Sequence, residues 1–218
     1  MKFGVIGNGS IGKRHIRNLI TLGFEDIILL RKIGKGNEYN CAEFNEMKAF
    51  LDDQPDAIII ANPTSLHAEY LTQILDRNMH VMVEKPVLAT MEELQTIQKQ
   101  LINYTAIGMT AYNMRFHPCV KETQRLIESG VLGKVYSSRF FVGQYLPDWR
   151  PNNDYSKSYS ADKEMGGGVI FDLIHEIDLA CFLVGEPRSN IAAEVDKLSD
   201  LQIQTEDIVE ALYRSKRN

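Results

Sequence analysis

Three features of the sequence predict an α/β protein that begins with a doubly wound parallel sheet. Short apolar runs alternate with helix-like segments through the first half of the chain, as in successive β-α-β units. A glycine-rich turn directly follows the first apolar run. After residue 115 the alternation gives way to longer, less regular segments. We therefore expect two domains, over residues 1–115 and 116–218.

The first domain contains five apolar runs with the length and composition of strands buried on both faces. They are residues 3–6, 27–30, 57–61, 80–83 and 106–109. Helix-like segments lie between most of them, over residues 11–22, 41–51, 65–77 and 91–101. Thr90 and Glu93 form a capping-box pattern at the start of the last helix. This alternation favours right-handed crossovers between parallel strands.

The second domain has a different set of predicted elements. They are a helix over residues 118–128, a strand over 135–145, a polar and aromatic loop up to Lys163, a helix over 169–184, and strands over 192–198 and 207–213. Gly185 and Pro187 mark the end of the second helix. Because no repeat or flexible linker separates the domains, we expect them to pack together around a ligand cleft.

Composition excludes several classes of function. The net charge of −5 and the scattered basic residues give no reason to expect a nucleic-acid partner. Cys41, Cys119 and Cys181 lie far apart, which indicates neither a disulfide framework nor a zinc site and fits a reducing cytoplasm. No apolar stretch of about 18 residues and no leader pattern is present, so we expect no membrane span and no secretion.

The turn over residues 7–12 has the Gly-x-Gly-x-x-Gly spacing and lies between a predicted strand and a predicted helix. Its glycines allow a tight turn and let the backbone approach a dinucleotide pyrophosphate. The alternative is a turn whose glycines serve only packing. His15, in the helix that follows, is expected to be structural and not catalytic.

The end of the second predicted strand bears on the choice of cofactor. An acid there commonly binds the adenosine ribose of NAD, whereas a cation can accept the 2′-phosphate of NADP. Arg31 and Lys32 stand at this position, and no acid does. The sequence thus favours NADP(H) over NAD(H), with solvated cations as the alternative.

The strand over residues 57–61 is followed by Asn62, Pro63, Thr64 and Ser65. The carboxyl ends of parallel strands are where open sheets bind ligands, so we expect this segment to contact the cofactor. Capping of the next helix by Thr64 or Ser65 is an equally simple reason for one hydroxyl. For His67, a cofactor contact and a structural hydrogen bond are both open.

Lys85 directly follows the strand over residues 80–83, and Pro86 prevents that strand from continuing. The ammonium group is expected to project from the strand end, where it can transfer a proton while hydride moves. The alternative is a surface lysine paired with Glu84.

Asp172 and His175 are spaced to share one face of the predicted helix that follows three glycines. An apolar stripe runs beside them, consisting of Ile170, Ile174, Ile177 and Cys181. A carboxylate and an imidazole on one face can act on a common substrate, although such a pair can also be an ordinary helix-surface hydrogen bond.

Five segments in this order resemble the Gfo/Idh/MocA family of NAD(P)-dependent oxidoreductases: residues 4–15, 62–67, 84–86, 112–118 and 166–178. The resemblance implies a Rossmann domain followed by an α/β domain with an open, mostly antiparallel sheet. It also implies hydride transfer between NADP or NAD and a hydroxyl or carbonyl carbon of a sugar, cyclitol or nucleotide sugar.

The resemblance assigns roles to individual residues. Lys85 and His175 become catalytic, with Asp172 as the substrate-binding neighbour of His175 and with Asn113 and Arg115 lining the cleft. The spacing of three between Asp172 and His175, like residues 145–150, resembles the branch that acts on nonulosonic acids and other surface sugars. The loop residues Trp149, Arg150, Tyr155 and Tyr159 are expected to stack on a sugar and bind an anionic group. The expected cofactor site comprises Gly7, Asn8, Gly9, Ser10, Ile11, Gly12, Arg31, Lys32, Asn62, Pro63, Thr64, His67, Glu84 and Lys85.

Family members typically continue well beyond the position of Tyr213. We therefore expect a shortened second domain with an open sheet edge. The missing part of the sheet motivates one alternative function, a catalytically inactive NAD(P)-binding homologue. The resemblance implies another, an NAD-dependent glycosidase, because such enzymes exist within the family. A homodimer or higher oligomer through the second-domain sheet is the expected assembly.

Overall fold

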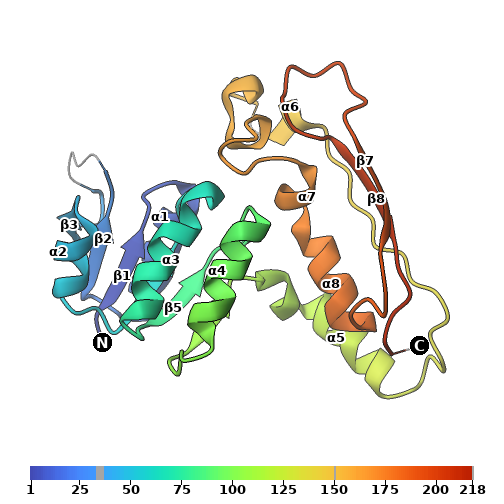
Figure 1. Cartoon of the computed structure of the whole chain (residues 1–218), viewed down its shortest axis with the longest axis horizontal. Coiled ribbons are helices and arrows are strands. Elements are labelled where there is room, and N and C mark those ends of the chain that lie inside the picture. Colours follow the sequence, from blue (N-terminus) through green and yellow to red (C-terminus); the bar gives the residue numbers. More distant parts are fainter. Residues whose placement is uncertain (33–36, 150, 218) are drawn as a thin grey trace. The chain divides into compact units, whose positions relative to one another are not determined.

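The computed structural model describes residues 1–32, 37–149 and 151–217. The chain divides into two compact units, residues 1–111 and 112–218 (Figure 1). The boundary predicted after residue 115 lies inside the short 3-10 helix η2 (Asn113–Phe116) of the second unit. Each unit has its own sheet.

The first unit is built on six parallel strands in the order β3-β2-β1-β4-β5-β6. Their bounds are β1 Phe3–Ile6, β2 Ile27–Leu30, β3 Ala42–Phe44, β4 Ala57–Ile60, β5 His80–Val83 and β6 Gly108–Thr110. The chain leaves β1 toward β2 on one side and later returns to β4 on the other. The topological switch point of this doubly wound sheet therefore lies between β1 and β4, where such sheets bind ligands.

Helices cover both faces of this sheet. They are α1 (Ser10–Thr21), α2 (Met47–Asp52), α3 (His67–Asp76) and α4 (Met91–Leu101). Successive strand side chains point to opposite faces, so Val5 packs with Ile16 of α1 while Ile6 packs with α2, α3 and α4. Figure 1 shows α3 beside α4. Two apolar layers therefore stabilise the sheet, at about 1.5–3 kcal/mol for each fully buried aliphatic side chain.

Two predicted helix starts in this unit are wrong, whereas the predicted cap of α4 is confirmed. The helix expected from residue 41 begins at Met47, because residues 42–44 instead form β3, which pairs with β2. The helix expected from residue 65 begins at His67, so Leu66 and not Thr64 or Ser65 occupies its N-cap. Thr90 and Glu93 form the predicted capping box.

The second unit is less regular. It contains α5 (Pro118–Glu128), α6 (Leu146–Trp149), η3 (Tyr155–Lys157), η4 (Tyr159–Ala161), α7 (Val169–Asp172), α8 (Ile174–Val184), β7 (Ala192–Asp196) and β8 (Ile208–Leu212). β7 and β8 form an antiparallel pair. The strand predicted over residues 135–145 is not formed, because none of the described strands pairs with this segment.

The single helix predicted over residues 169–184 is two helices. Leu173 has φ −102° and ψ 26°, outside the α-helical range, and separates α7 from α8. Gly185, with φ 97°, ends α8 as predicted. None of the helices within the described residues is long and apolar enough to cross a membrane.

Candidate functional site

The glycine turn after β1 uses its three glycines in different ways. A Cβ atom on Gly12 would lie 2.0 Å from the Gly7 carbonyl oxygen. A Cβ atom on Gly7 would lie 2.8 Å from the Ala61 carbonyl oxygen, and Gly7 also has a φ of +102°. A Cβ atom on Gly9 would meet no other described atom within 4 Å. Gly7 and Gly12 therefore allow close packing, whereas Gly9 faces open space.

The N-terminus of α1 opens at the same turn. Gly9 occupies the N-cap, no side chain within residues 1–32 caps the helix, and its first turn contains no acid. Gly9 and Ser10 are exposed, and Ile11 is half-buried. Backbone N–H groups at such an end, together with the helix dipole, favour an anion such as a phosphate.

Two asparagines at the switch point carry buried polar atoms that lack hydrogen bonds. Asn8 follows β1, and its Oδ1 has no partner among the residues the structure describes. Asn62 follows β4, and the same holds for both its Oδ1 and its Nδ2. Buried polar groups are nearly always paired, so these amides are suited to a polar ligand. Pro63 and the buried Thr64 continue the loop from Asn62.

His67 is buried, with an exposed fraction of 1%. Its Nδ1 lies 2.9 Å from the Pro86 carbonyl oxygen and 3.2 Å from that of Val87, and its Nε2 lies 2.9 Å from the Asn62 carbonyl oxygen. Burial lowers the pKa of His67, although these carbonyls and Glu84 act in the opposite direction. This geometry supports the structural alternative for His67.

Glu84 and Lys85 follow β5 at the carboxyl edge of the sheet, and the Lys85–Pro86 peptide is cis. The sequence left open a surface pair between Glu84 and the Lys85 side chain, and the structure places Glu84 in contact with His15 of α1. Its Oε1 lies 2.8 Å from His15 Nε2, and its Oε2 accepts the Lys85 backbone N–H at 3.2 Å. Burial raises the pKa of Glu84, but the interactions with His15 and Lys85 together outweigh it and leave this pKa below its ordinary value.

Arg31 and Lys32 lie at the end of β2, as predicted. The Arg31 guanidinium is paired with Glu43 of β3 and is only 18% exposed. Lys32 is exposed. Glu43 was not predicted as a partner of Arg31, because the sequence predicts a helix at this residue.

In the second unit, Asp172 ends α7 and His175 lies in the first turn of α8. The break at Leu173 lies between them, so they are not on one continuous helix as predicted. The His175 ring contacts Tyr112 edge to face, with ring centroids 6.2 Å apart. Burial raises the pKa of Tyr112, and Asp178 adds to this effect. Tyr112 was not predicted as a site residue, although it directly precedes Asn113 in one of the quoted motifs.

Arg115 lies in η2 with Asn113 and is held by Asp178 of α8. Its Nε donates to Asp178 Oδ2 at 2.9 Å, and its Nη2 donates to Oδ1. The guanidinium also lies over the rings of Tyr112 and Phe182, 5.3 and 4.9 Å from their centroids. The Asp178 side chain is only 4% exposed. Arg115 therefore links η2 to α8, a structural role that the sequence did not suggest.

The aromatic loop residues make contacts within the second unit. Tyr159 donates to the Gly166 carbonyl oxygen at 2.5 Å, and Tyr155 accepts the Gln202 backbone N–H at 3.3 Å. The Trp149 indole N–H is buried and has no acceptor in the described part of the chain. Arg150, predicted to bind an anion, lies outside the described residues.

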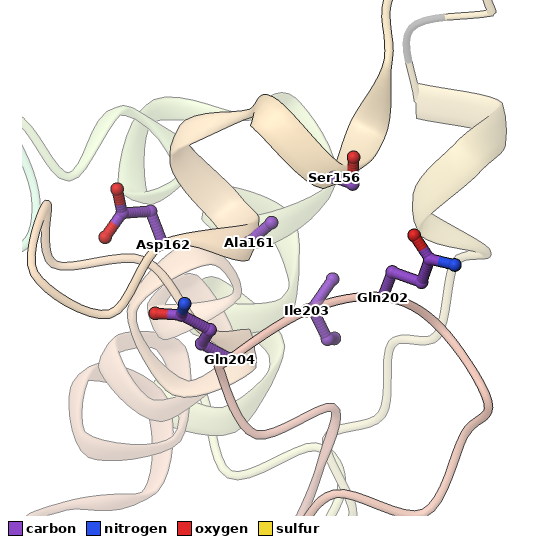
Figure 2. Close-up of a pocket in the computed structure, with 6 residues that line it drawn as sticks. All are labelled: Ser156, Ala161, Asp162, Gln202, Ile203 and Gln204. Carbon is purple, nitrogen blue, oxygen red and sulfur yellow. The ribbon is translucent and has the colours of Figure 1, made fainter.

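A pocket of about 360 Å³ lies beside this loop (Figure 2). Ser156, Ala161 and Asp162 form one side, and residues 202–204 form the other. The Gln204 backbone N–H donates to the Ala161 carbonyl oxygen at 3.1 Å and holds the two sides together. The pocket is lined by none of the predicted catalytic residues.

A doubly wound sheet with a Gly-x-Gly-x-x-Gly turn defines a dinucleotide-binding class of protein, and the buried amide atoms of Asn8 and Asn62 that lack partners within the described residues fit this class. Residues 1–112 match the family described as "Oxidoreductase family, NAD-binding Rossmann fold", and residues 120–218 match the "GFO/IDH/MocA C-terminal domain". The chain belongs to the Gfo/Idh/MocA family, as the resemblance implied.

Among curated relatives, a levoglucosan dehydrogenase from Pseudarthrobacter phenanthrenivorans is 30% identical over 205 residues, covering 85% of this chain and 52% of the relative. A myo-inositol 2-dehydrogenase from Thermotoga maritima is 27% identical over 215 residues, covering 93% and 60%. The chain thus spans about half to three-fifths of the length of these relatives.

Solved structures show the same fold. A levoglucosan dehydrogenase in complex with NADH and levoglucosan has a TM-score of 0.82 at 25% identity, covering 99% of this chain and 64% of that one. The WlbA dehydrogenase from Bordetella pertussis, in complex with NADH and UDP-GlcNAcA, has a TM-score of 0.81 at 21% identity, covering 100% and 66%.

Proposed function

We propose that this protein binds a nicotinamide dinucleotide and transfers hydride to or from a hydroxyl or carbonyl carbon of a sugar, cyclitol or nucleotide sugar. The observation that carries the proposal is the set of buried amide atoms, Asn8 Oδ1 and both Oδ1 and Nδ2 of Asn62, that have no hydrogen-bond partner among the described residues at the switch point. They lie where β1 and β4 end, next to a turn whose Gly9 leaves open space. Family membership and the named dehydrogenase relatives support the same reaction class.

The residues present fit the cofactor. In the proposal, the N–H groups at the start of α1 bind the pyrophosphate, and Gly9 lets it approach. The Asn8 and Asn62 amides hydrogen-bond its polar groups. When bound, the nicotinamide ring supplies the acceptor or donor of hydride.

Side chains of this protein are proposed to accept or donate the proton of the substrate hydroxyl. During oxidation, the carbinol C–H bond breaks with transfer of hydride, and the O–H proton passes to a base, which leaves a carbonyl. The proposal assigns this proton to Lys85 and His175, with Asp172 orienting the substrate hydroxyl. Reduction reverses each step. Trp149, with its buried indole N–H, and the loop tyrosines are assigned to the sugar.

For the ribose end of the cofactor, the proposal favours NADP(H) over NAD(H). Arg31 and the exposed Lys32 stand at the end of β2, where a 2′-phosphate is received. Glu43 moderates this preference, because its carboxylate pairs with Arg31. Discrimination between the cofactors is therefore expected to be modest.

Separate titrations with NADH and NADPH test the proposal, with nicotinamide fluorescence and thermal stability followed in the same samples. We expect saturable binding of either nucleotide and a rise in melting temperature, because a ligand that binds only the folded state stabilises it. Levoglucosan and myo-inositol are the first substrates to assay, since relatives are named for them. Protein that is folded by circular dichroism but binds neither nucleotide would rule the proposal out.

A further inference from the structure

Two histidines flank Lys85 from helices on opposite faces of the first sheet. His15 belongs to α1, which packs on the face that includes Val5. His67 begins α3, which packs on the face that includes Ile6. His15 contacts Glu84, the residue before Lys85, and His67 contacts Pro86, the residue after it.

The contact on the first side is a carboxylate bridge. One oxygen of Glu84 lies 2.8 Å from His15 Nε2, and the other accepts the Lys85 backbone N–H. The side chains of His15 and Glu84 are only 15% and 18% exposed, so water competes little for this hydrogen bond. The bridge therefore links the position of α1 to the peptide group of Lys85.

The contact on the second side is a buried imidazole. His67 bridges the Pro86 carbonyl oxygen and the Asn62 carbonyl oxygen, both at 2.9 Å. Carbonyl oxygens only accept hydrogen bonds, and a neutral imidazole carries one N–H, so His67 donates to one of these carbonyls and lies in contact with the other. Its position joins the loop after β4 to the turn after β5. Lys85 lies between two residues that are each held by a histidine.

We propose that His15 and His67 are positioning residues that together fix the backbone of Lys85. The role of Lys85 itself rests on the proposed function. The contacts of His15 with Glu84 and of His67 with Pro86, here called the clamp, are a property of the protein without cofactor. A proton-transfer group must be held close to its productive geometry, because displacement by about 1 Å can cost on the order of a hundredfold in rate. Neither histidine needs to touch substrate to have this effect.

The test follows the Lys85 side chain directly by NMR, after ¹³C reductive methylation of the lysines. The Lys85 resonance is assigned by its loss in Lys85→Arg. We expect it to move by more than its line width in His15→Gln and in His67→Gln. The matched control is His80→Gln, because His80 lies at the opposite end of β5, where its Nδ1 accepts the Ile107 backbone N–H. A Lys85 resonance that stays in place in both clamp variants would overturn the proposal.

A second measurement covers the case in which His67→Gln does not fold. In the unmodified protein, the ring N–H of His67 is expected to exchange with solvent at least about a hundredfold more slowly than that of His80, because exchange then needs local opening. Equal exchange rates would contradict the clamp. NADH titration of the same samples keeps the two hypotheses separate, since failure to bind NADH counts against the proposed function and leaves the lysine result to decide the clamp.

Discussion

The Arg31 guanidinium donates two hydrogen bonds to the Glu43 carboxylate, from Nε to Oε2 at 2.8 Å and from Nη2 to Oε1 at 3.1 Å. This pair joins the end of β2 to the edge strand β3. Arg31, the cation predicted to bind a 2′-phosphate, therefore already has the Glu43 carboxylate as a counterion.

Neutralising Glu43 is expected to shift the cofactor preference toward NADPH. In Glu43→Gln, Arg31 loses its counterion, and the repulsion between the carboxylate and a 2′-phosphate disappears. The Kd for NADPH should fall by about threefold to fivefold, because about 1 kcal/mol of electrostatic interaction corresponds to about fivefold in Kd. The Kd for NADH should stay within about twofold. Fluorescence titration at low salt measures both, with Glu25→Gln, at the other end of β2, as the control.

Gly9→Val is expected to weaken NADH binding and keep the fold. Gly9 has φ −74° and ψ −174°, which other residues adopt readily, and its Cβ would meet nothing among the described atoms. The melting temperature should fall by at most about 3 °C, whereas the Kd for NADH should rise by more than about tenfold, because the side chain fills the space left for pyrophosphate. Gly12→Ala gives the opposite pattern, with a loss of stability caused by its contact with Gly7. Tight NADH binding by Gly9→Val would contradict the assigned site.

Lys85→Met is expected to lower turnover by about a hundredfold or more, because it removes the general acid or base. The Kd for NADH should change by less than about threefold. Steady-state kinetics on any substrate that is turned over, combined with nucleotide titration, separates the two effects. Lys99→Met, at an exposed position on α4, is the control. Equal turnover by Lys85→Met would reject the catalytic role.

The lowered pKa of Glu84 predicts how its contribution to stability depends on pH. Because this pKa is lower in the folded protein than in the unfolded chain, the contribution is fully present above the ordinary carboxyl pKa and is lost as pH falls through the folded value. Urea unfolding of the wild type and Glu84→Gln should therefore differ by about 1 kcal/mol at pH 7 and converge in acid. A difference that stayed constant down to pH 3 would show that the carboxylate is not stabilised in this way.

Arg115→Met is expected to destabilise the second unit, because it leaves the buried carboxylate of Asp178 without its guanidinium. A loss of about 2 kcal/mol is reasonable for charged hydrogen bonds to a partly exposed arginine. Trp149 is the only tryptophan of the chain, so its fluorescence reports on this unit. The double variant Arg115→Met with Asp178→Asn should recover part of the loss. NADH binding should be unaffected in either variant.

The strands of the first sheet could be predicted because the central ones are buried on both faces and therefore read as continuous apolar runs. Edge strand β3 could not, since its three residues are exposed or half-buried and carry no such signal. The Arg31–Glu43 pair was missed for the same reason. The break at Leu173 was also missed, because neither glycine nor proline marks it.

The candidate site was predictable where a local motif defines it, as at residues 7–12, 62–64 and 84–85. The contacts that support these residues were not predictable. His15 and Glu84 are 69 positions apart, and their contact depends on which face of the sheet α1 covers. Arg115 and Asp178 are 63 positions apart and meet only because η2 packs against α8.

The three glycines of the turn after β1 are under two different selective pressures, one from packing within the protein and one from ligand binding. Gly7 and Gly12 are required by packing, so any descendant that still folds is expected to keep them. Gly9 is constrained only by what approaches it from outside. A lineage that stopped using a dinucleotide could therefore lose Gly9 first without a loss of abundance in the cell. A side chain at this single position would mark a pseudoenzyme in which the other two glycines remain unchanged.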